Sequence, residues 1–258
     1  LGVLGKYDEA ARLLRKVVKD DPQLLEAWAE LAYIYELDDD FARAEATYSE
    51  LLDQGETSLE LWRRLIELNI RLENSERALA LARQAPDELA FLLSAATLFM
   101  DNDMYDEAEA ILLPKAGDDA PPEVLFYLSM LEYQGRQDKE ASMAYLLRIS
   151  PGEEYYDRSL QFQSHLALEM EDTELALERA ALGRETFPED REFWLLEARL
   201  LQLHDRIEDA MDVLRQASEA WPEDTEILFT LGVLHDNRKE YDQAMEIMER
   251  VIAIDAIH

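Results

Sequence analysis

Hydrophobic positions recur along the chain with the spacing of amphipathic helices that come in pairs. In the stretch EAWAELAYIYELDDDFARAEATYSELLDQ, residues 26–54, Trp28 and Tyr35 lie on the apolar face of one helix. The run DDD follows as a polar turn, and Ala44 and Tyr48 lie on the apolar face of a second helix. The pattern predicts a helix–turn–helix unit.

A column of alanines shows that this unit repeats. One alanine stands near the start of each second helix, in the motif Tyr-Asp-Glu/Gln-Ala where it is most complete. The column consists of Ala10, Ala44, Ala78, Ala108, Ala141, Ala176, Ala210 and Ala244. The common spacing is about 34 residues, a typical length for a helical repeat. A small residue lets the two helices of a unit approach closely, and a larger side chain would overpack the contact by about 1–3 kcal/mol.

These features resemble the tetratricopeptide repeat family, whose pattern is W-x2-L-G-x2-Y, then A-x3-F and P. The stretch LFTLGVLHDNRKEYDQAMEIM at 228–248 is a close match. The resemblance covers essentially the whole chain and implies an all-α fold, a right-handed superhelical solenoid of antiparallel helix pairs. We expect one solenoid over 1–258, with a half-repeat at 1–24 and full repeats at about 25–58, 59–88, 89–121, 122–156, 157–190, 191–224 and 225–258.

Two features predict an irregular zone at about 85–122. The unit between Ala78 and Ala108 is shorter than the others, so its second helix should lose about one turn. Pro114 lies late in the next second helix, which should therefore end early. The array also begins with a half-repeat and has no polar helix after its last unit. We therefore expect a fragment of a longer repeat protein, with apolar surface exposed at both ends.

The charge of the chain restricts the classes of partner that are expected to bind it. It has 25 Lys and Arg against 58 Asp and Glu, a formal net charge of −33. Such an acidic protein is repelled by nucleic acid and by anionic membranes, so neither is expected as a partner. No apolar run reaches transmembrane length, and the chain has no cysteine. We expect a soluble protein of the cytoplasm or the periplasm, with the choice between the two left open.

No residue pattern indicates an enzyme. The histidines His165, His204, His235 and His258 have no metal-ligand spacing. The chain lacks the glycine-rich phosphate loop G-x-x-x-x-G-K-[ST]. The acidic stretch DNDMYDE at 101–107 lacks the glycine and the distal Glu of a calcium-binding loop. We expect no catalysis, no cofactor and no metal.

The resemblance also implies that the first helices line a concave surface, where partner peptides or helices bind. By register, the expected partner-binding residues are Tyr33, Arg63, Arg71, Leu93, Met100, Phe126, Met130, Tyr133, His165 and Arg199. We call the five residues Leu93, Met100, Phe126, Met130 and Tyr133 the central patch. Its methionines and aromatic rings suit an apolar partner segment. The alternative is that these side chains pack between neighbouring first helices. Nearby arginines could pair with partner carboxylates.

The predicted function is a non-catalytic protein–protein interaction scaffold that binds a partner segment on its concave face. Two alternatives stay open. One is an oligomerising module of a larger bacterial envelope-biogenesis or secretion and assembly protein. The other is a superhelix that binds a small ligand. Self-association through the exposed terminal repeats is a further expected contact.

Overall fold

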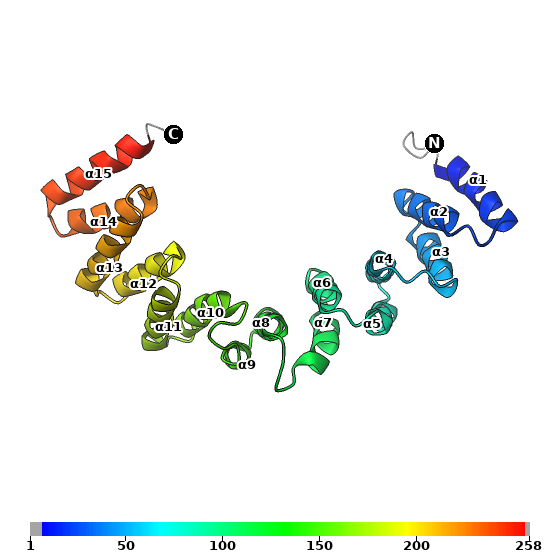
Figure 1. Ribbon diagram of the computed structural model, residues 1–258, viewed down its shortest axis with the longest axis horizontal. Coiled ribbons are helices and arrows are strands. Elements are labelled where there is room, and N and C mark those ends of the chain that lie inside the picture. Colours follow the sequence, from blue (N-terminus) through cyan, green and yellow to red (C-terminus); the bar gives the residue numbers. More distant parts are fainter. Residues whose placement is uncertain (1–6, 256–258) are drawn as a thin grey trace. The chain divides into compact units, whose positions relative to one another are not determined.

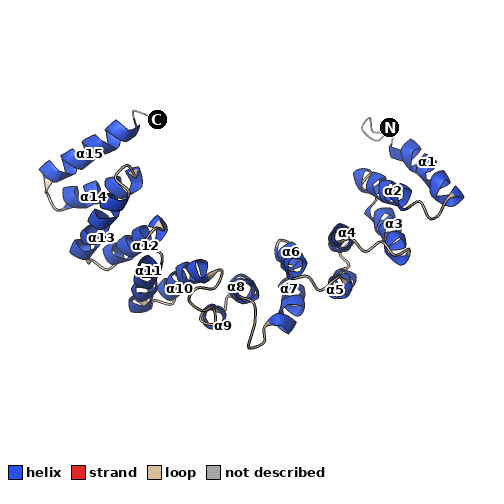
Figure 2. Cartoon of the chain, in the orientation of Figure 1, coloured by secondary structure: helices blue, strands red, loops and turns tan. Residues whose placement is uncertain are grey.

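Every secondary-structure element in the described part of the chain is helical. The computed structural model describes residues 7–255, and within this range helices follow one another without strands (Figures 1 and 2). Most helices that are neighbours in the sequence pack against each other. This arrangement confirms the all-α helical repeat solenoid that the sequence predicts.

The chain divides into two compact units, Leu1–Arg136 and Gln137–His258. The division lies within the repeat expected at about 122–156. The helices of the first unit are α1 (Tyr7–Asp20), α2 (Leu25–Leu37), α3 (Phe41–Asp53), α4 (Leu59–Arg71), α5 (Ser75–Gln84), α6 (Leu89–Met100), α7 (Tyr105–Leu112), the 3-10 helix η2 (Leu113–Lys115), α8 (Pro122–Leu131) and the π-helix η3 (Glu132–Arg136).

The second unit continues the alternation of first and second helices. Its helices are α9 (Lys139–Leu146), α10 (Tyr156–Glu169), α11 (Thr173–Thr186), α12 (Arg191–Leu203), α13 (Ile207–Ala220), α14 (Thr225–Asn237) and α15 (Tyr241–Asp255). Residues 1–6 of the expected half-repeat and residues 256–258 of the last repeat lie outside the described residues.

The turn inside the helix pairs repeats one backbone conformation. A non-glycine residue takes a positive φ in it, between 55° and 64°, at Asp39, Glu73, Asp103, Glu171, Asp205 and Lys239. The next backbone N–H then donates to a carbonyl five residues earlier, as from Asp40 to Tyr35 and from Arg206 to Leu201, both at 2.9 Å. This left-handed helix ending satisfies carbonyls that the helix end leaves unpaired. The polar turns of the sequence therefore stop each first helix and start the second.

The alanine column is buried at nearly every position. Seven of its eight members are buried, namely Ala10, Ala44, Ala78, Ala108, Ala176, Ala210 and Ala244. The exception is Ala141, which is partly exposed on the short helix α9. Burial at these seven positions agrees with the small side chain that the repeat pattern places there.

Both predicted shortenings are present, and the irregularity extends further than predicted. Helix α5 has 10 residues against 13 in α3. Helix α7 has 8 residues and is followed by the 3-10 helix that contains Pro114, which has no N–H to continue an α-helix. Beyond residue 122, α8 passes into the π-helix η3 and α9 has only 8 residues. The wider hydrogen-bonded turn of a π-helix is not visible in the apolar period that predicts helices.

The terminal helices expose apolar side chains, as the sequence predicts. On α1, Leu13 and Val17 are exposed. On α15, Met245 is 63% and Ile252 is 68% exposed.

Candidate functional site

The ten residues predicted from the register lie on the first helices of the pairs or directly after one. In chain order they are Tyr33 on α2, Arg63 and Arg71 on α4, Leu93 and Met100 on α6, Phe126 and Met130 on α8, Tyr133 in η3, His165 on α10 and Arg199 on α12. The first eight belong to the first compact unit, and the last two belong to the second. All ten are at least partly exposed.

The central patch is half-buried. Its helices α6 and α8 pack against each other, and Thr97 on α6 lies 3.5 Å from the Tyr127 hydroxyl on α8. Each of the five patch residues has intermediate exposure. The side chains therefore have surface both for packing between first helices and for contact with another molecule.

Both arginines predicted on α4 already have acidic neighbours on the same helix. Arg63 lies 3.1 Å from Glu60 and 3.5 Å from Glu67, and Arg71 lies 3.0 Å from Glu67. Exposed ion pairs of this kind typically contribute about 0.2–1 kcal/mol. They would therefore compete only weakly with a carboxylate of a partner.

In the second unit, the two predicted residues stand on separate first helices. His165 Nε2 lies 3.1 Å from Glu169 Oε1, and its ring stacks near that of Phe162 with centroids 6.4 Å apart. Arg199 is exposed on α12. Each position thus presents a polar group on a first helix of this unit.

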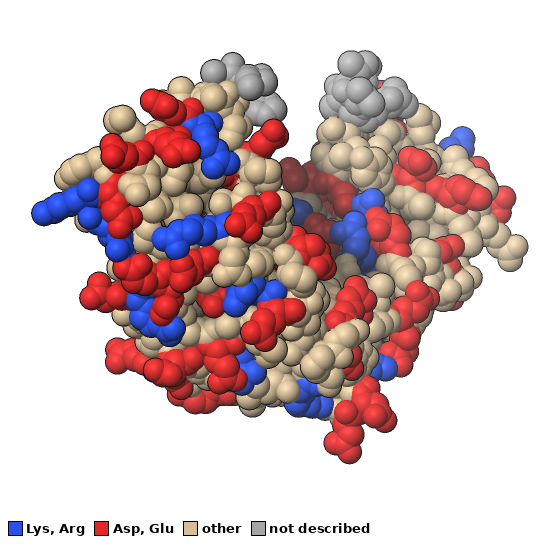
Figure 3. Space-filling view, turned by 60° about the vertical axis from the view of Figure 1, so that its left-hand side comes forward, with Lys and Arg blue, Asp and Glu red and all other residues tan. Residues whose placement is uncertain are grey.

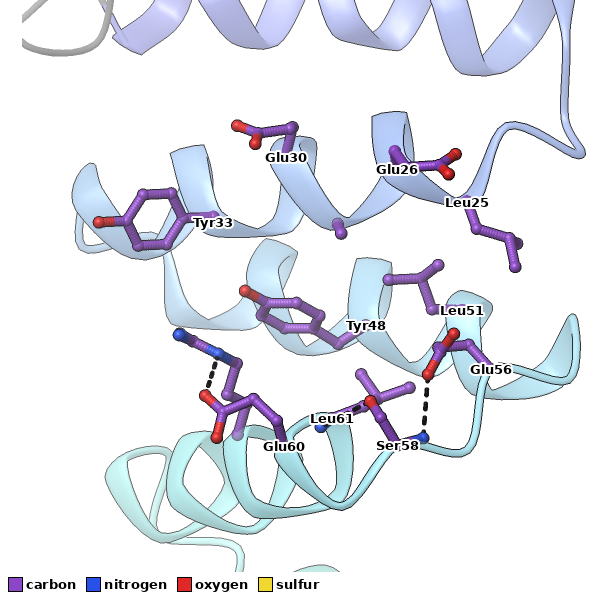
Figure 4. Close-up of a pocket in the computed structure, with 12 residues that line it drawn as sticks. Leu25, Glu26, Glu30, Tyr33, Tyr48, Leu51, Glu56, Ser58, Glu60 and Leu61 are labelled. Carbon is purple, nitrogen blue, oxygen red and sulfur yellow. Dashed lines mark hydrogen bonds and ion pairs between the residues drawn. The ribbon is translucent and has the colours of Figure 1, made fainter.

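A groove that the register does not single out lies between α2 and α4 (Figure 4). Its volume is about 420 Å³. The floor comes from α3, where Tyr48 and Leu51 are only 4% and 2% exposed, and from Leu61 at the start of α4. On the α2 side the exposed Ala29 lies one turn before Tyr33. We call this feature the α2–α4 groove.

Carboxylates surround the α2–α4 groove. The charged residues that line it are Glu26, Glu30, Glu56, Glu60 and Arg64. Arg64 links the two first helices, because its Nη1 lies 3.1 Å from Glu36 on α2 and its Nε lies 2.9 Å from Glu60 on α4. Since its one cation is shared by two carboxylates, the groove keeps an excess of negative charge.

The electrostatic environment keeps the groove floor neutral and its edge ionised. Burial, and then the neighbouring Glu36 carboxylate, raise the pKa of Tyr48, so its hydroxyl stays protonated at neutral pH. The hydrogen bond from Arg63 lowers the pKa of Glu60, so this carboxyl stays ionised. The groove therefore offers an apolar, uncharged floor beside negative charges.

Acidic side chains are not confined to this groove. On the face of the molecule drawn in Figure 3, carboxylates are spread widely, with basic side chains between them. Among residues 7–255, no cluster of three or more His, Asp or Glu side chains is arranged to hold a metal ion. Within the same range, no helix has the length and apolar character needed to cross a bilayer.

Sequence reasoning found part of the α2–α4 groove and missed its floor. Of the ten residues predicted from the register, Tyr33 lines the groove. The register misses Tyr48 and Leu51, because second helices are expected to turn their side chains toward the core of the pair. The available signal was the small Ala29 at a position where a large side chain would close the groove.

The fold defines the chain as an α-helical repeat protein built from helix pairs. A family model described as tetratricopeptide repeat matches residues 4–68 and 201–256. The periodic alanines and the paired helices agree with this match. The match to these two segments and the helix pairs support a tetratricopeptide repeat protein.

One solved structure shares the fold at low sequence identity, and a second is similar over a larger share of its own length. A chain from the structure of Naa15/Naa10 bound to HypK-THB is 17% identical, with 90% of this chain and 37% of that chain covered and a TM-score of 0.52. This chain thus spans little more than a third of that protein. MamA 41-end from Desulfovibrio magneticus RS-1 is 15% identical, with 79% of this chain and 98% of that chain covered and a TM-score of 0.47. No curated protein matches the chain significantly.

Proposed function

We propose that this protein is a non-catalytic scaffold that binds a segment of a partner protein on the faces of its first helices. Tetratricopeptide repeat arrays are protein-interaction scaffolds, and their extended surfaces suit a partner chain. The single observation that carries the proposal is the half-buried central patch on α6, α8 and η3.

The chemistry of the central patch fits a partner with apolar side chains. Met100 and Met130 have flexible, polarisable side chains that adapt to irregular apolar surfaces. Phe126 and Tyr133 add large contact areas that gain much from burial. Because α6 and α8 are first helices of successive repeats, a bound segment that crosses one would continue onto the other.

Affinity capture from a native lysate tests this proposal. The chain is compared with a variant that carries Phe126→Arg and Met130→Asp in the central patch. A matched control carries Leu72→Asp and Leu147→Arg, which change two exposed leucines to the same charged residues. Partners held by the parent and the control should be lost by the patch variant, whose folding is checked by circular dichroism. Identical captures by all three proteins would contradict the proposal.

Self-association is a second candidate function, and an observation on α15 favours it. Met245 and Met248 follow Met211 and Leu214 of α13 by one repeat length. Met211 and Leu214 are fully buried in a core that includes Ile227 of α14. Met245, in contrast, is largely exposed. The exposed face of α15 therefore carries side chains at the positions through which α13 packs against the first helix α14.

Light scattering of the protein as it elutes from a size-exclusion column tests self-association directly. We expect the mass to rise above the 29.9 kDa of one chain as the concentration increases. Met245→Glu with Ile252→Lys should restore the mass of one chain, because both changes place charge on the exposed face. A control with Glu219→Lys, an exposed position on α13, should associate as the parent does. A parent that keeps the mass of one chain at every concentration would exclude this function.

A further inference from the structure

We propose that the α2–α4 groove binds a basic amphipathic segment of a partner protein. A Lys or Arg of that segment lies against the carboxylates of α2, and an apolar side chain beside it rests on the groove floor. This inference rests on the proposed scaffold function, and it adds a site distinct from the central patch together with the chemistry of the partner.

The floor of the groove is built to receive an apolar side chain. Ala29 lines the groove with a side chain that ends at its Cβ, and Tyr33, Tyr48 and Leu51 line the same space. The resulting volume of about 420 Å³ falls within the range of ligand-binding clefts, about 300–1,000 Å³. An apolar side chain bound there would be removed from water and would contact apolar surface on three helices. This burial favours binding.

The edge of the groove selects a cation. Glu26 and Glu30 lie one helical turn apart on α2, and both are exposed. Within residues 7–255 neither has an ion-pair partner. Glu60 differs, because Arg63 and Arg64 lie 3.1 and 2.9 Å from it. The two uncompensated carboxylates are therefore the groups that complement a partner's Lys or Arg.

Neither feature alone would identify the partner. A cation without an apolar side chain would find carboxylates over much of this acidic protein, so its binding would be diffuse. An acidic segment would be repelled, because Arg64 already serves Glu36 and Glu60. Only a segment that presents a cation and an apolar side chain about one helical turn apart matches the groove better than it matches the remaining surface.

Three labelled peptides of equal length provide the probes. The first places leucines at i, i+3, i+4 and i+7 with lysines between them, which makes an amphipathic helix. The second replaces each leucine by serine, and the third replaces each lysine by glutamate. Binding to the full chain is measured by fluorescence anisotropy near physiological ionic strength, ~0.15 M. We expect the leucine–lysine peptide to bind at least about tenfold more tightly than the other two, which corresponds to about 1.4 kcal/mol.

Variants locate that binding in the groove. Ala29→Leu fills the space without a change of charge, and Glu26→Lys with Glu30→Lys reverses the edge. Each should weaken the leucine–lysine peptide by about tenfold or more. The matched control Glu219→Lys with Glu223→Lys makes the same charge change at exposed positions of the second unit and should alter affinity by less than about twofold.

Several outcomes would overturn the proposal. An equal loss in the control would mean that the peptide binds the acidic surface as a whole. Equal affinity for the serine peptide would remove the role of the floor, and preference for the glutamate peptide would reverse the partner's charge. The central-patch variant with Phe126→Arg and Met130→Asp should still bind the leucine–lysine peptide. If peptide binding fails while partner capture still depends on the central patch, the groove assignment falls and the scaffold function stands.

Discussion

Two segments of the chain share one layout and differ in a few inner side chains. The first runs from α2 to α4, and the second runs from α12 to α14. Helices α2, α4, α12 and α14 each have 13 residues. Ala29 of α2 is exposed beside a groove, whereas Leu195 at the same place in α12 is 6% exposed and belongs to a core cluster. The two segments thus differ in side-chain size at the place where one has an open groove and the other a packed residue.

The two segments also differ in charge at the start of their first helices. Arg191 begins α12 and reaches the next repeat, where it lies 2.6 Å from Asp224 and 3.0 Å from Glu226. The same place in α2 is Leu25, which lines the groove instead. The comparison teaches that the repeat fold fixes the positions while a few inner residues decide whether a position packs or binds.

The largest effect that would sharpen this comparison concerns the contact between the first helix of each segment and the helix before it. Phe193 of α12 is fully buried over Gly183 of α11, where an added Cβ would overlap its ring. The matching pair in α2 and α1 is Ala27 and Val17, with the large and small residues exchanged. We expect Phe193→Ala to lower the free energy of unfolding by about 3–5 kcal/mol. We expect Gly183→Ala to lower it by about 1–3 kcal/mol.

The double variant decides whether the two residues act as a size pair. With Phe193→Ala present, Gly183→Ala should cost little, because the ring that it would meet is gone. Urea unfolding followed by circular dichroism measures all three variants. Val17→Ala, at an exposed position, is the control and should stay within about 0.5 kcal/mol of the parent. Additive losses in the double variant would show that the two sites are independent.

An effect of intermediate size on stability at high pH should distinguish the second helices of the two segments. Tyr48 of α3 stands where α13 has Leu214, and both are buried. Burial and then the Glu36 carboxylate raise the pKa of Tyr48, so the folded state holds the phenolic proton more tightly than the unfolded state does. The stabilisation is complete below an unfolded pKa of about 10 and is lost as the pH rises toward the folded pKa. The slope from this one group is at most about 1.4 kcal/mol per pH unit.

Unfolding free energies measured across the alkaline range test this sign. Tyr48→Phe should flatten the loss of stability above about pH 10 relative to the parent. Tyr48→Leu, which installs the residue of α13, should share the flatter profile. If the parent and Tyr48→Phe lose stability in parallel, the phenol of Tyr48 ionises equally in the folded and unfolded states, and the floor of the groove is not the protected environment described above.

The sequence predicts the helices of these segments better than the groove between them. Helix pairs follow from a local apolar period, and the early end of α7 follows from Pro114. The groove depends on Tyr48, a second-helix residue whose ring reaches an inner face. It also depends on Arg64, whose partner Glu36 stands 28 positions earlier in the chain. Such contacts are set by side-chain conformation and helix packing, which no periodicity encodes.

The smallest effect concerns the cation that spans the second segment. Arg191→Leu gives α12 the residue that α2 has, and it removes the ion pairs to Asp224 and Glu226. We expect a loss of no more than about 1 kcal/mol, because exposed ion pairs gain little over hydrated charges. The loss should shrink as salt is added. The control is Arg199→Leu on the same helix, at an exposed arginine.

The size of this loss tests the reason why the second segment is closed. If Leu195 closes the second segment by packing, the inner face stays filled in Arg191→Leu. The free energy of unfolding of this variant, measured in urea, should then stay close to the parent value at both low and high salt. A loss that matches that of Phe193→Ala, and persists at high salt, would mean that the cation rather than the leucine joins the two repeats. In that case Ala29→Leu would not be expected to close the α2–α4 groove by itself, and Leu25→Arg with Ser58→Asp would be the substitution that does.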